Sequence, residues 1–485
     1  MVGPLPKTPP ERPADGEAGV AALGARARDD LGYVDHPAAA WRPAPSSHVD
    51  LVDVLVIGAG QSGLAVAFQL LRDKVENLVV VDRAPRGGEG PWRTFARMPR
   101  LRSPKDFNGP DLGVPSLTYR AWHEARFGTD DWQRLQLIPR HHWADYLDWF
   151  RDTLALPVRN RVAIEHLTLE DGAVVATGSD EAGAPVTFRC RRVVLATGLD
   201  GLGHWWMPPT VAALPRHLRA HAADTIDFAE LDGKRVGVLG AGASAADNAA
   251  SALEAGAAEV VLCCRRPELQ RIQPYRWLTF AGFLRHLSDL DDTWRWRFMH
   301  HVMSLREGFP QDTYDRCVRH HNFRIATDAA WTSCAVTKRG TVAVESPAER
   351  FEFDYVIAGT GIDVDFGKRP ELAPYADAIA TWGDRYQPEP GLEDERLARY
   401  PYLGADFTFQ EKLPGTAPIL GRLHVFNFGA TMSFGPSGSS INAMTTAVPK
   451  LAAGVTRGLF RDDVESYWQS LQSFDDKIIR FPGEA

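Results

Sequence analysis

Runs of hydrophobic residues that end in glycine-rich turns recur along this chain, and each is followed by a segment with helical spacing. The run VLVIGAGQSGLAVAFQLL begins at residue 54, and RVGVLGAGASAADNAA contains the corresponding turn after residue 235. A second hydrophobic strand follows each of them, NLVVVD ending at Asp82 and EVVLCC ending at Cys264. Strands that alternate with helices in this way predict parallel sheets of the doubly wound α/β class.

A later pair of strands repeats this pattern. RRVVLATGLD and DYVIAGTGID each end a hydrophobic strand in a turn of small residues, at 196–198 and at 359–361. Short alternating segments precede both strands and predict a small antiparallel insertion in each half of the chain. The sequence therefore predicts an α/β protein with two Rossmann-like dinucleotide-binding domains, the second inserted into the first.

These landmarks set the expected domain boundaries. We expect an N-terminal extension over 1–49 with a short helix at 17–31, the first part of the outer domain over 50–205, the inserted domain over 206–350, and the return to the outer domain over 351–485. The segment at about 266–334 is rich in Trp, Arg and His and contains two stretches with helical spacing, FAGFLRHL and DTWRWRFMHHVMSL. It predicts an amphipathic helical insert packed on the second domain.

The two glycine-rich turns have the spacing of dinucleotide fingerprints. The first contains Gly58, Gly60 and Gly63; the second contains Gly240, Gly242 and Ala245, with Ser244 in the first helical turn. In each, the first position permits a tight turn and the second lets the backbone approach a pyrophosphate. The third lets the helix pack closely on its strand. The pyrophosphate then lies at a helix N-terminus, where unpaired N–H groups and the helix dipole favour negative charge.

The residue after the second strand distinguishes the two fingerprints. Asp82 in the first is a carboxylate that accepts hydrogen bonds from ribose hydroxyls and repels a 2′-phosphate. Arg265 and Arg266 stand there in the second, where they attract a 2′-phosphate. The first site therefore suits FAD or NAD, and the second suits NADP.

Together these motifs resemble the flavin-dependent monooxygenases of the two-dinucleotide class (class B), which includes flavin-containing, N-hydroxylating and Baeyer–Villiger enzymes. The resemblance covers most of residues 50–450 and implies FAD in the first domain and NADPH in the second. The segment GPWRTFARMPRLRSPKDFNG at 90–109 resembles the loop near the flavin ring, and FNFGATMSFGPSGSSINAM at 426–444 resembles the segment that closes over the flavin. The resemblance thus implies FAD contacts from Trp92, Arg93, Gly198, Gly438 and Ser439.

The same resemblance implies a reaction. NADPH reduces the flavin, the reduced flavin captures molecular oxygen as a C4a-peroxide, and one oxygen atom passes to a small-molecule substrate. The family's linker signature is altered, because LPRHLRAHAADTIDF keeps His221 but has Pro215 and His217 where Phe and Gly are expected. This departure favours oxygenation of an amine nitrogen, as in an amino-acid-like acid. Baeyer–Villiger or sulfur oxygenation, and a flavin reductase or oxidase that transfers no oxygen, stay open.

No catalytic residue is evident from the sequence. Lys105, in the flavin loop, and Arg276, after the second NADP strand, are candidates for binding an anionic substrate, together with Arg102 if the three cluster. Each has a competing interpretation as a cofactor contact or a solvent-exposed side chain. Substrate identity and oligomeric state are not predicted.

The composition of the chain limits the classes of partner that we expect the protein to bind. A formal net charge of −8 disfavours nucleic acid as a partner, and no stretch approaches the roughly 18 apolar residues of a membrane span. The five cysteines show neither a disulfide framework nor metal-ligand spacing, which favours a reducing cytoplasm. The three His-His pairs lack acidic partners at ligand spacing, so we expect no metal.

Overall fold

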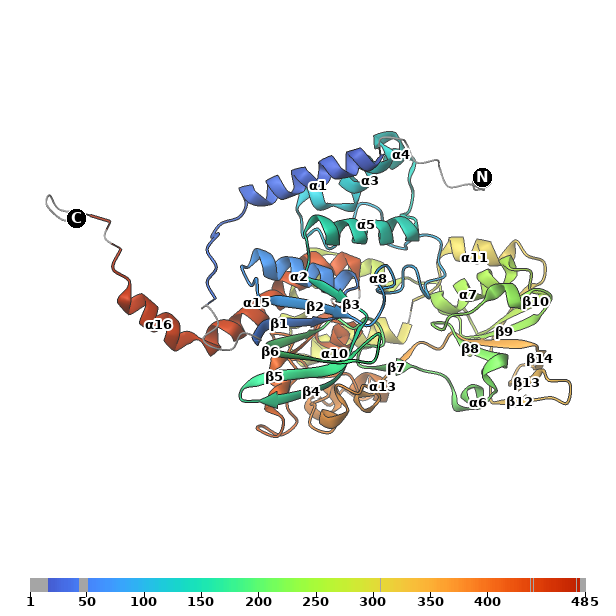
Figure 1. The fold of residues 1–485 in the computed structure, drawn as a ribbon. Helices are drawn as coiled ribbons and strands as arrows, with labels where there is room; N and C mark the ends of the chain where they lie inside the picture. The colour runs from blue at the N-terminus through green and yellow to red at the C-terminus, as the bar shows by residue number, and fades with distance from the viewer. Residues whose placement is uncertain are drawn as a thin grey trace.

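The computed structural model describes residues 16–42, 51–305, 307–436, 438, 440–476 and 478–479. Two α/β units lie side by side, and a layer of helices covers one face of the first unit (Figure 1). Both units contain parallel strands alternating with helices, which confirms the fold class predicted from the hydrophobic pattern. Ser439, an expected FAD contact, lies outside the described residues, as do 1–15 and 43–50 of the expected N-terminal extension.

The first unit is built on a seven-stranded sheet in the order β3-β2-β1-β6-β5-β4, with β17 also paired to β6. Its strands are β1 (Leu51–Ile57), β2 (Leu78–Asp82), β3 (Val158–Asn160), β4 (Val162–Glu170), β5 (Ala173–Asp180), β6 (Pro185–Leu195) and β17 (Leu423–Val425). β6 joins two sub-structures: its first half pairs antiparallel with β5, and its second half pairs parallel with β1 and β17. The antiparallel insertion expected in the first half of the chain is therefore continuous with the main sheet.

Helices cover this sheet in layers. α2 (Gln61–Arg72) packs on α15 (Met444–Asp462), and α1 (Gly16–Tyr33), α3 (Tyr119–Phe127) and α5 (Arg140–Thr153) form a further layer above α2 (Figure 1). The short α4 (Thr129–Arg134) follows α3. In α5, Trp143, Tyr146 and Phe150 lie three or four residues apart on one face, so all three rings are buried in the core.

The second unit contains a five-stranded parallel sheet in the order β11-β10-β9-β15-β8. These strands are β8 (Arg219–His221), β9 (Arg235–Leu239), β10 (Glu259–Cys263), β11 (Phe323–Ala326) and β15 (Tyr355–Ala358), with helices α6 (Pro209–Ala212), α7 (Ala243–Glu254) and α11 (Gln311–Val318). A separate antiparallel sheet contains β12 (Ser333–Val336), β13 (Val342–Glu345) and β14 (Arg350–Phe353). It matches the second expected insertion.

The expected boundary at 350/351 is wrong. β15 lies beyond it, yet β15 is hydrogen-bonded between β9 and β8 inside the second sheet. The chain crosses between the units on a two-stranded ribbon, in which β7 (Gly203–Trp205) pairs antiparallel with β16 (Ile362–Val364). The N–H of Trp206 donates to the carbonyl of Gly361 at 2.9 Å. The second unit therefore spans about 206–361.

The helical insert also differs from the prediction. α8 (Pro274–Trp277), α9 (Ala281–His286) and α10 (Asp292–Leu305) do form, but their apolar side chains join the core of the first unit. Trp296 is fully buried, and its Nε1 donates to the carbonyl of Leu392 at 2.8 Å. α9 contacts α15, and α10 contacts α14 (Thr431–Phe434). The amphipathic pattern predicted the helices correctly and their partner wrongly.

The remaining helices belong to the return segment. They are α12 (Trp382–Arg385), α13 (Glu395–Ala398) and the C-terminal α16 (Val464–Ser473). α16 extends away from the first unit rather than packing along it (Figure 1).

Candidate functional site

The three glycines of the first fingerprint are required for two different reasons. Gly58 has a φ of +106°, and a Cβ there would lie 2.3 Å from the carbonyl oxygen of Ala196. A Cβ on Gly63 would lie 1.8 Å from the carbonyl oxygen of Gly58. A Cβ on Gly60 would meet nothing closer than the Cα of Gly90, at 3.9 Å. Packing therefore explains the outer two glycines, whereas the middle one borders a cradle suited to a pyrophosphate.

The N-terminus of α2 lies at this cradle. Its N-cap is Gly60, and no side chain caps the helix. The N–H groups of the first turn and the positive end of the helix dipole are therefore available to an anion. The loop from Gly87 to Arg93 and helix α5 lie beside Gly60. This arrangement fits the diphosphate of FAD.

Asp82 ends β2 next to the glycine turn. Its two carboxylate oxygens accept from the N–H of Ala59 at 2.7 Å and the N–H of Ala84 at 2.8 Å. These bonds fix the carboxylate at the edge of the cradle, and each oxygen retains a further lone pair for a ribose hydroxyl. The geometry is compatible with the role expected from the sequence.

Trp92 and Arg93 end the loop beside the fingerprint, but they differ in whether the chain already provides a partner for their polar groups. The Trp92 ring is buried, and its Nε1 has no hydrogen-bond partner within the part of the chain described. Such an orphan donor is costly unless a ligand accepts from it. Arg93 instead pairs with Asp145 at 2.7 Å and Asp148 at 2.8 Å, both on α5. Burial lowers the pKa of Arg93, but these two carboxylates outweigh it and raise the pKa overall. Arg93 is therefore a brace for the loop, and Trp92 is the better FAD contact of the two.

The return segment closes against both halves of the first site. Asn427 is fully buried, and its Nδ2 donates to the Thr197 hydroxyl at 3.0 Å in the turn that also contains Gly198. A Cβ on Gly438 would lie 2.3 Å from the Asn427 carbonyl oxygen, so only glycine fits there. The Gly438 carbonyl accepts from Ser62 in the first turn of α2 at 3.2 Å. Asn427 is a positioning residue that the sequence did not identify, because its partners lie 230 residues away.

The second fingerprint repeats the plan with one substitution. Gly240 has a φ of +110°, and a Cβ there would lie 2.5 Å from the carbonyl oxygen of Gly359. Ala245 takes the third position, with its Cβ packed against Gly359. A Cβ on Gly242 would meet no atom of the described chain within 4 Å. The α7 N-terminus has no side-chain cap, and Ser244 is exposed on its first turn. This site also fits a pyrophosphate.

The two arginines after β10 have different environments. Arg265 is exposed, and its guanidinium has no partner among the described residues. Arg266 donates to the carbonyls of Leu305 at 3.0 Å and Ser304 at 2.7 Å, where α10 ends. A cation at a helix C-terminus offsets the dipole and satisfies terminal carbonyls. Arg265 is therefore free to bind a 2′-phosphate, whereas Arg266 anchors the helical insert.

The three candidate anion-binding side chains do not cluster. Lys105 donates to the carbonyl of Trp132 at 2.6 Å and lies 4.5 Å from the centre of that ring. Arg102 pairs with the buried Asp247 of α7 at 2.6 Å, which ties the flavin loop to the second unit. Arg276 is exposed on α8. Lys105 and Arg102 are thus committed to structural contacts, and Arg276 is the one of the three that stays a substrate candidate.

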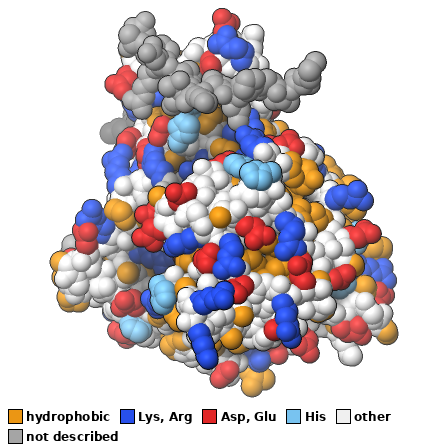
Figure 2. All heavy atoms as spheres, turned by 90° about the vertical axis from the view of Figure 1, so that its right-hand side faces the viewer, with side chains coloured by type: hydrophobic (Ala, Val, Ile, Leu, Met, Phe, Trp, Pro, Cys, Tyr) orange, Lys and Arg blue, Asp and Glu red, His pale blue; other side chains and the backbone are white. Residues whose placement is uncertain are grey.

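The described residues carry few other candidate reactive groups. Cys190, Cys263 and Cys317 are buried, and burial raises the pKa of each thiol to about 12. No group of three His, Cys, Asp or Glu within the described ranges is placed to hold a metal ion. None of the helices in the described part is long and apolar enough to cross a membrane. On the face shown in Figure 2, acidic and basic side chains are interspersed rather than gathered by sign.

Comparison with known proteins identifies the family. A model described as FAD-NAD(P)-binding matches residues 55–200. The chain is 39% identical over 450 residues to an FAD-dependent urate hydroxylase of Xanthomonas campestris pv. campestris, a match that covers 92% of this chain and 94% of that protein. This chain belongs to the FAD-dependent, two-dinucleotide-binding monooxygenase family.

Solved structures share the fold of this monooxygenase. An ornithine hydroxylase from Pseudomonas aeruginosa is 15% identical, with a TM-score of 0.65 over 84% of this chain and 100% of that chain. An ornithine N-hydroxylase from Kutzneria sp. 744, with reduced FAD, NADP+ and L-ornithine, is 16% identical, with a TM-score of 0.66 over 84% of this chain and 99% of that chain. The expected cofactors, FAD and NADPH, are confirmed for the monooxygenase.

Proposed function

We propose that this monooxygenase hydroxylates urate or a closely related purine, using NADPH and molecular oxygen. The observation that carries the proposal is the 39% identity, across nearly the whole of both chains, to a protein named as a urate hydroxylase. One oxygen atom enters the substrate, the other leaves as water, and NADPH supplies the two electrons. When bound, the flavin supplies the activation of oxygen.

The chemistry of urate agrees with oxygen transfer to an electron-rich atom. Nitrogen atoms flank its central carbon–carbon double bond and make that bond nucleophilic, so no acid catalyst is needed to activate it. Urate is also an anion near neutral pH. Arg276 is exposed and cationic on α8, and we assign it the role of a bidentate anchor for this anion.

The remaining roles in binding the two cofactors and excluding water are assigned to separate residues of the chain. The α2 N-terminus at Gly60 holds the FAD pyrophosphate, and Asp82 orients the ribose. Trp92 donates a hydrogen bond from its buried Nε1 to the bound FAD. The α7 N-terminus at Gly242 and the free guanidinium of Arg265 hold NADPH. The return segment around Asn427 and Gly438 excludes water from the first site.

Hydroxylation of an amine nitrogen is the second candidate. The fold is shared with amine N-hydroxylating enzymes, and an amine lone pair accepts oxygen with the same polarity as the urate double bond. Baeyer–Villiger oxygenation needs the opposite polarity and is less favoured, as the altered linker at Pro215 and His217 already indicated.

The test is coupled turnover with a panel of substrates. FAD-loaded enzyme is mixed with NADPH and with urate, ornithine, lysine, cadaverine, a thioether or a cyclic ketone. Substrate loss, oxygen uptake, NADPH oxidation and hydrogen peroxide are then measured together. We expect one oxygen and one NADPH per urate, and isotopically labelled oxygen in the product.

Three other outcomes would replace the proposal. Coupled turnover of an amine without urate turnover indicates N-hydroxylation, and coupling to the thioether or ketone indicates sulfur or Baeyer–Villiger oxygenation. NADPH oxidation that yields stoichiometric peroxide with every compound indicates a reductase or oxidase.

A further inference from the structure

The C-terminal helix α16 presents an apolar face that nothing in the described structure covers. Val464, Trp468 and Leu471 lie four and three residues apart, so they share one side of the helix. They are 51%, 58% and 65% exposed, and none of the α16 side chains described is buried. Large exposed apolar faces of this kind mark interaction surfaces.

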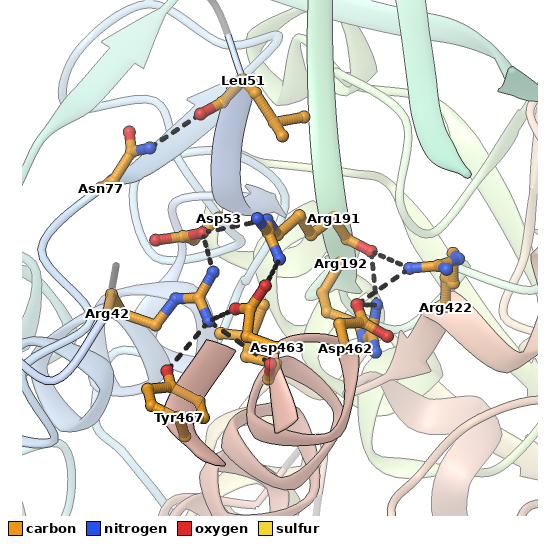
Figure 3. Close-up of polar contacts among 11 residues, drawn as sticks. Arg42, Leu51, Asp53, Asn77, Arg191, Arg192, Arg422, Asp462, Asp463 and Tyr467 are labelled. Carbon is orange, nitrogen blue, oxygen red and sulfur yellow. Dashed lines mark hydrogen bonds and ion pairs between the residues drawn. The ribbon is translucent and has the colours of Figure 1, made fainter. Parts of the chain in front are cut away.

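The base of α16 is fixed, so its exposure is not the result of a loose attachment. Asp463 pairs with Arg42 and, at 2.9 Å, with Arg191 of β6 (Figure 3). Arg42 also pairs with Asp53 of β1 at 2.9 Å. Burial lowers the pKa of Arg42, but Asp53 and Asp463 outweigh it and raise the pKa overall.

A second pair of contacts fixes the neighbouring residue. Asp462 pairs with Arg192 at 2.9 Å and Arg422 at 3.2 Å (Figure 3). Burial raises the pKa of Asp462, but these two arginines outweigh it and lower the pKa overall. Together the two clusters tie the end of α15 to the sheet and set the direction in which α16 leaves the unit.

A groove begins where α16 leaves the body. It has a volume of about 940 Å³ and is lined by α1, the segment after it, α2 and α15. Leu31, Val34 and Leu71 give it apolar walls, and Phe460 lines its edge. Phe460 stacks on Tyr467 of α16 with ring centres 4.8 Å apart. The apolar face of the helix is therefore continuous with the apolar wall of the groove.

The helix and the groove are also complementary in charge. From Val464 to Asp476 the chain contains Glu465, Asp475 and Asp476 and no Lys or Arg. The groove is lined by four basic side chains, Arg28, Arg72, Lys74 and Arg457, and by two acids, Asp35 and Asp73. Helices that lie on membranes carry Lys and Arg on their polar face, so α16, which has one acid and no Lys or Arg, is a poor membrane anchor.

We infer that α16 of one copy docks in the groove of a second copy, and that the two copies exchange these helices. Phe460 lines the groove and stacks on Tyr467 of α16, so a two-fold axis near it brings each helix onto the partner's groove in an isologous contact. Each copy then contributes a helix face and a groove, and both apolar surfaces leave water. The occupant is a second copy of this chain.

The test is the oligomeric state of the full-length, FAD-loaded protein by analytical ultracentrifugation over a concentration series. We expect a dimer with twice the chain mass of 53.6 kDa. The double variant Trp468→Glu/Leu471→Glu should weaken dimerisation at least about 30-fold. The control Ser466→Glu/Gln469→Glu adds the same charge on the opposite face and should change it less than about threefold.

A mixing experiment distinguishes helix-in-groove exchange from pairing of the two helices with each other. Ala453→Glu/Arg457→Glu alters exposed residues of the groove and leaves α16 intact. Alone, it should be monomeric; mixed with Trp468→Glu/Leu471→Glu, it should form a heterodimer through the one intact helix and the one intact groove. FAD content and NADPH oxidation should be unchanged in both.

Four results would overturn the inference. They are a monomeric wild-type protein at micromolar concentration, a dimer that survives Trp468→Glu/Leu471→Glu, the absence of heterodimer in the mixture, and co-flotation of wild-type monomer with phosphatidylglycerol vesicles. The last would instead assign α16 to a membrane surface.

Discussion

At the first fingerprint, the loop at Gly90 faces Gly60, and the return segment at Gly438 packs over the start of α2. At the second fingerprint, the corresponding Gly242 has no described atom within 4 Å of the position its Cβ would take, and Arg265 is exposed. The two sites share a strand, a turn and an uncapped helix, yet a loop and the return segment lie beside the first, which leaves the second the more open of the two. From this difference we expect the first site to hold its cofactor more tightly than the second.

The comparison also separates what folding requires from what binding requires. In both fingerprints the first and third positions are closely packed by the chain itself, whereas the middle glycine is not. The backbone at Gly60 has a φ of −67° and at Gly242 a φ of −80°, which other residues adopt easily. A side chain at these two positions is therefore excluded by the ligand rather than by the fold.

The largest effects on cofactor binding are expected when Gly60 and Gly242 are each replaced by valine. Gly60→Val should fold normally but lose at least about tenfold in FAD retention, because its methyl groups occupy the pyrophosphate cradle. Gly242→Val should keep its FAD and lose reduction by NADPH. Flavin content after gel filtration and anaerobic bleaching by NADPH measure the two effects. A fully yellow Gly60→Val protein would contradict the assignment of the first site.

Acid should destabilise the unit that holds the first site. Burial lowers the pKa of His142 and of His424 from 6.5 to about 4, and both residues belong to that unit. Between these values the unfolded chain binds protons that the folded histidines do not, so the free energy of unfolding falls as the pH drops from 6.5 to 4. Each histidine contributes on the order of 3 kcal/mol at most.

Urea unfolding and flavin release across this pH range measure the effect. His424→Asn preserves the contact with the Asp406 carbonyl, which His424 Nδ1 makes at 2.7 Å, and should flatten the pH dependence. The exposed His166→Asn, on β4, is the control and should leave it unchanged. A wild-type protein equally stable at pH 6.5 and pH 4.5 would count against the buried neutral histidines.

The ion pair between Arg102 of the flavin loop and Asp247 of α7 joins the two units and can be removed selectively. Arg102→Ala leaves the buried Asp247 of α7 without one of its partners and should cost about 1–3 kcal/mol. Because α7 carries the second fingerprint, the KM for NADPH should rise several-fold while FAD content stays constant. Arg100→Ala removes a more exposed pair with Asp312 at 3.5 Å and should cost less than about 1 kcal/mol. Equal effects of the two substitutions would contradict a specific role for Arg102.

The smallest effect is expected at the second of the paired arginines. Arg266→Ala removes the two bonds to the end of α10 and should lower stability by about 1–2 kcal/mol. It should change the preference for NADPH over NADH less than about twofold. Gln270→Ala removes only uncharged bonds, one to the Leu305 carbonyl and one from the Ile272 N–H, and should have a smaller effect on stability. Thermal unfolding and steady-state kinetics with both nucleotides provide the comparison. A large loss of NADPH preference would show instead that Arg266 binds the 2′-phosphate.

The local sequence pattern was sufficient to predict both fingerprints. The strand, the glycine turn and the helix are adjacent in the sequence, and one physical requirement explains the residue type at each position of the turn. The two antiparallel insertions were predicted on the same grounds. The family assignment followed from these motifs.

Long-range pairing was the limit of the prediction. The run at Tyr355–Ala358 is hydrophobic whichever sheet it joins, so its membership of the second sheet was missed. The apolar face of α10 that carries Trp296 predicts that this face is buried, but it does not predict which part of the protein covers it. Arg93 with Asp145 and Arg102 with Asp247 meet across 52 and 145 residues, and neither pairing has a sequence signal.

The most direct test of the account is anaerobic reduction of the bound flavin by NADPH and by NADH, in wild type and in Arg265→Ala. The account predicts that wild type prefers NADPH and that Arg265→Ala loses about 1.5–3 kcal/mol of NADPH binding with little change for NADH. FAD should stay bound in both. Equal losses for the two nucleotides, or a wild-type protein with no preference, would contradict the assignment of the open site to NADPH.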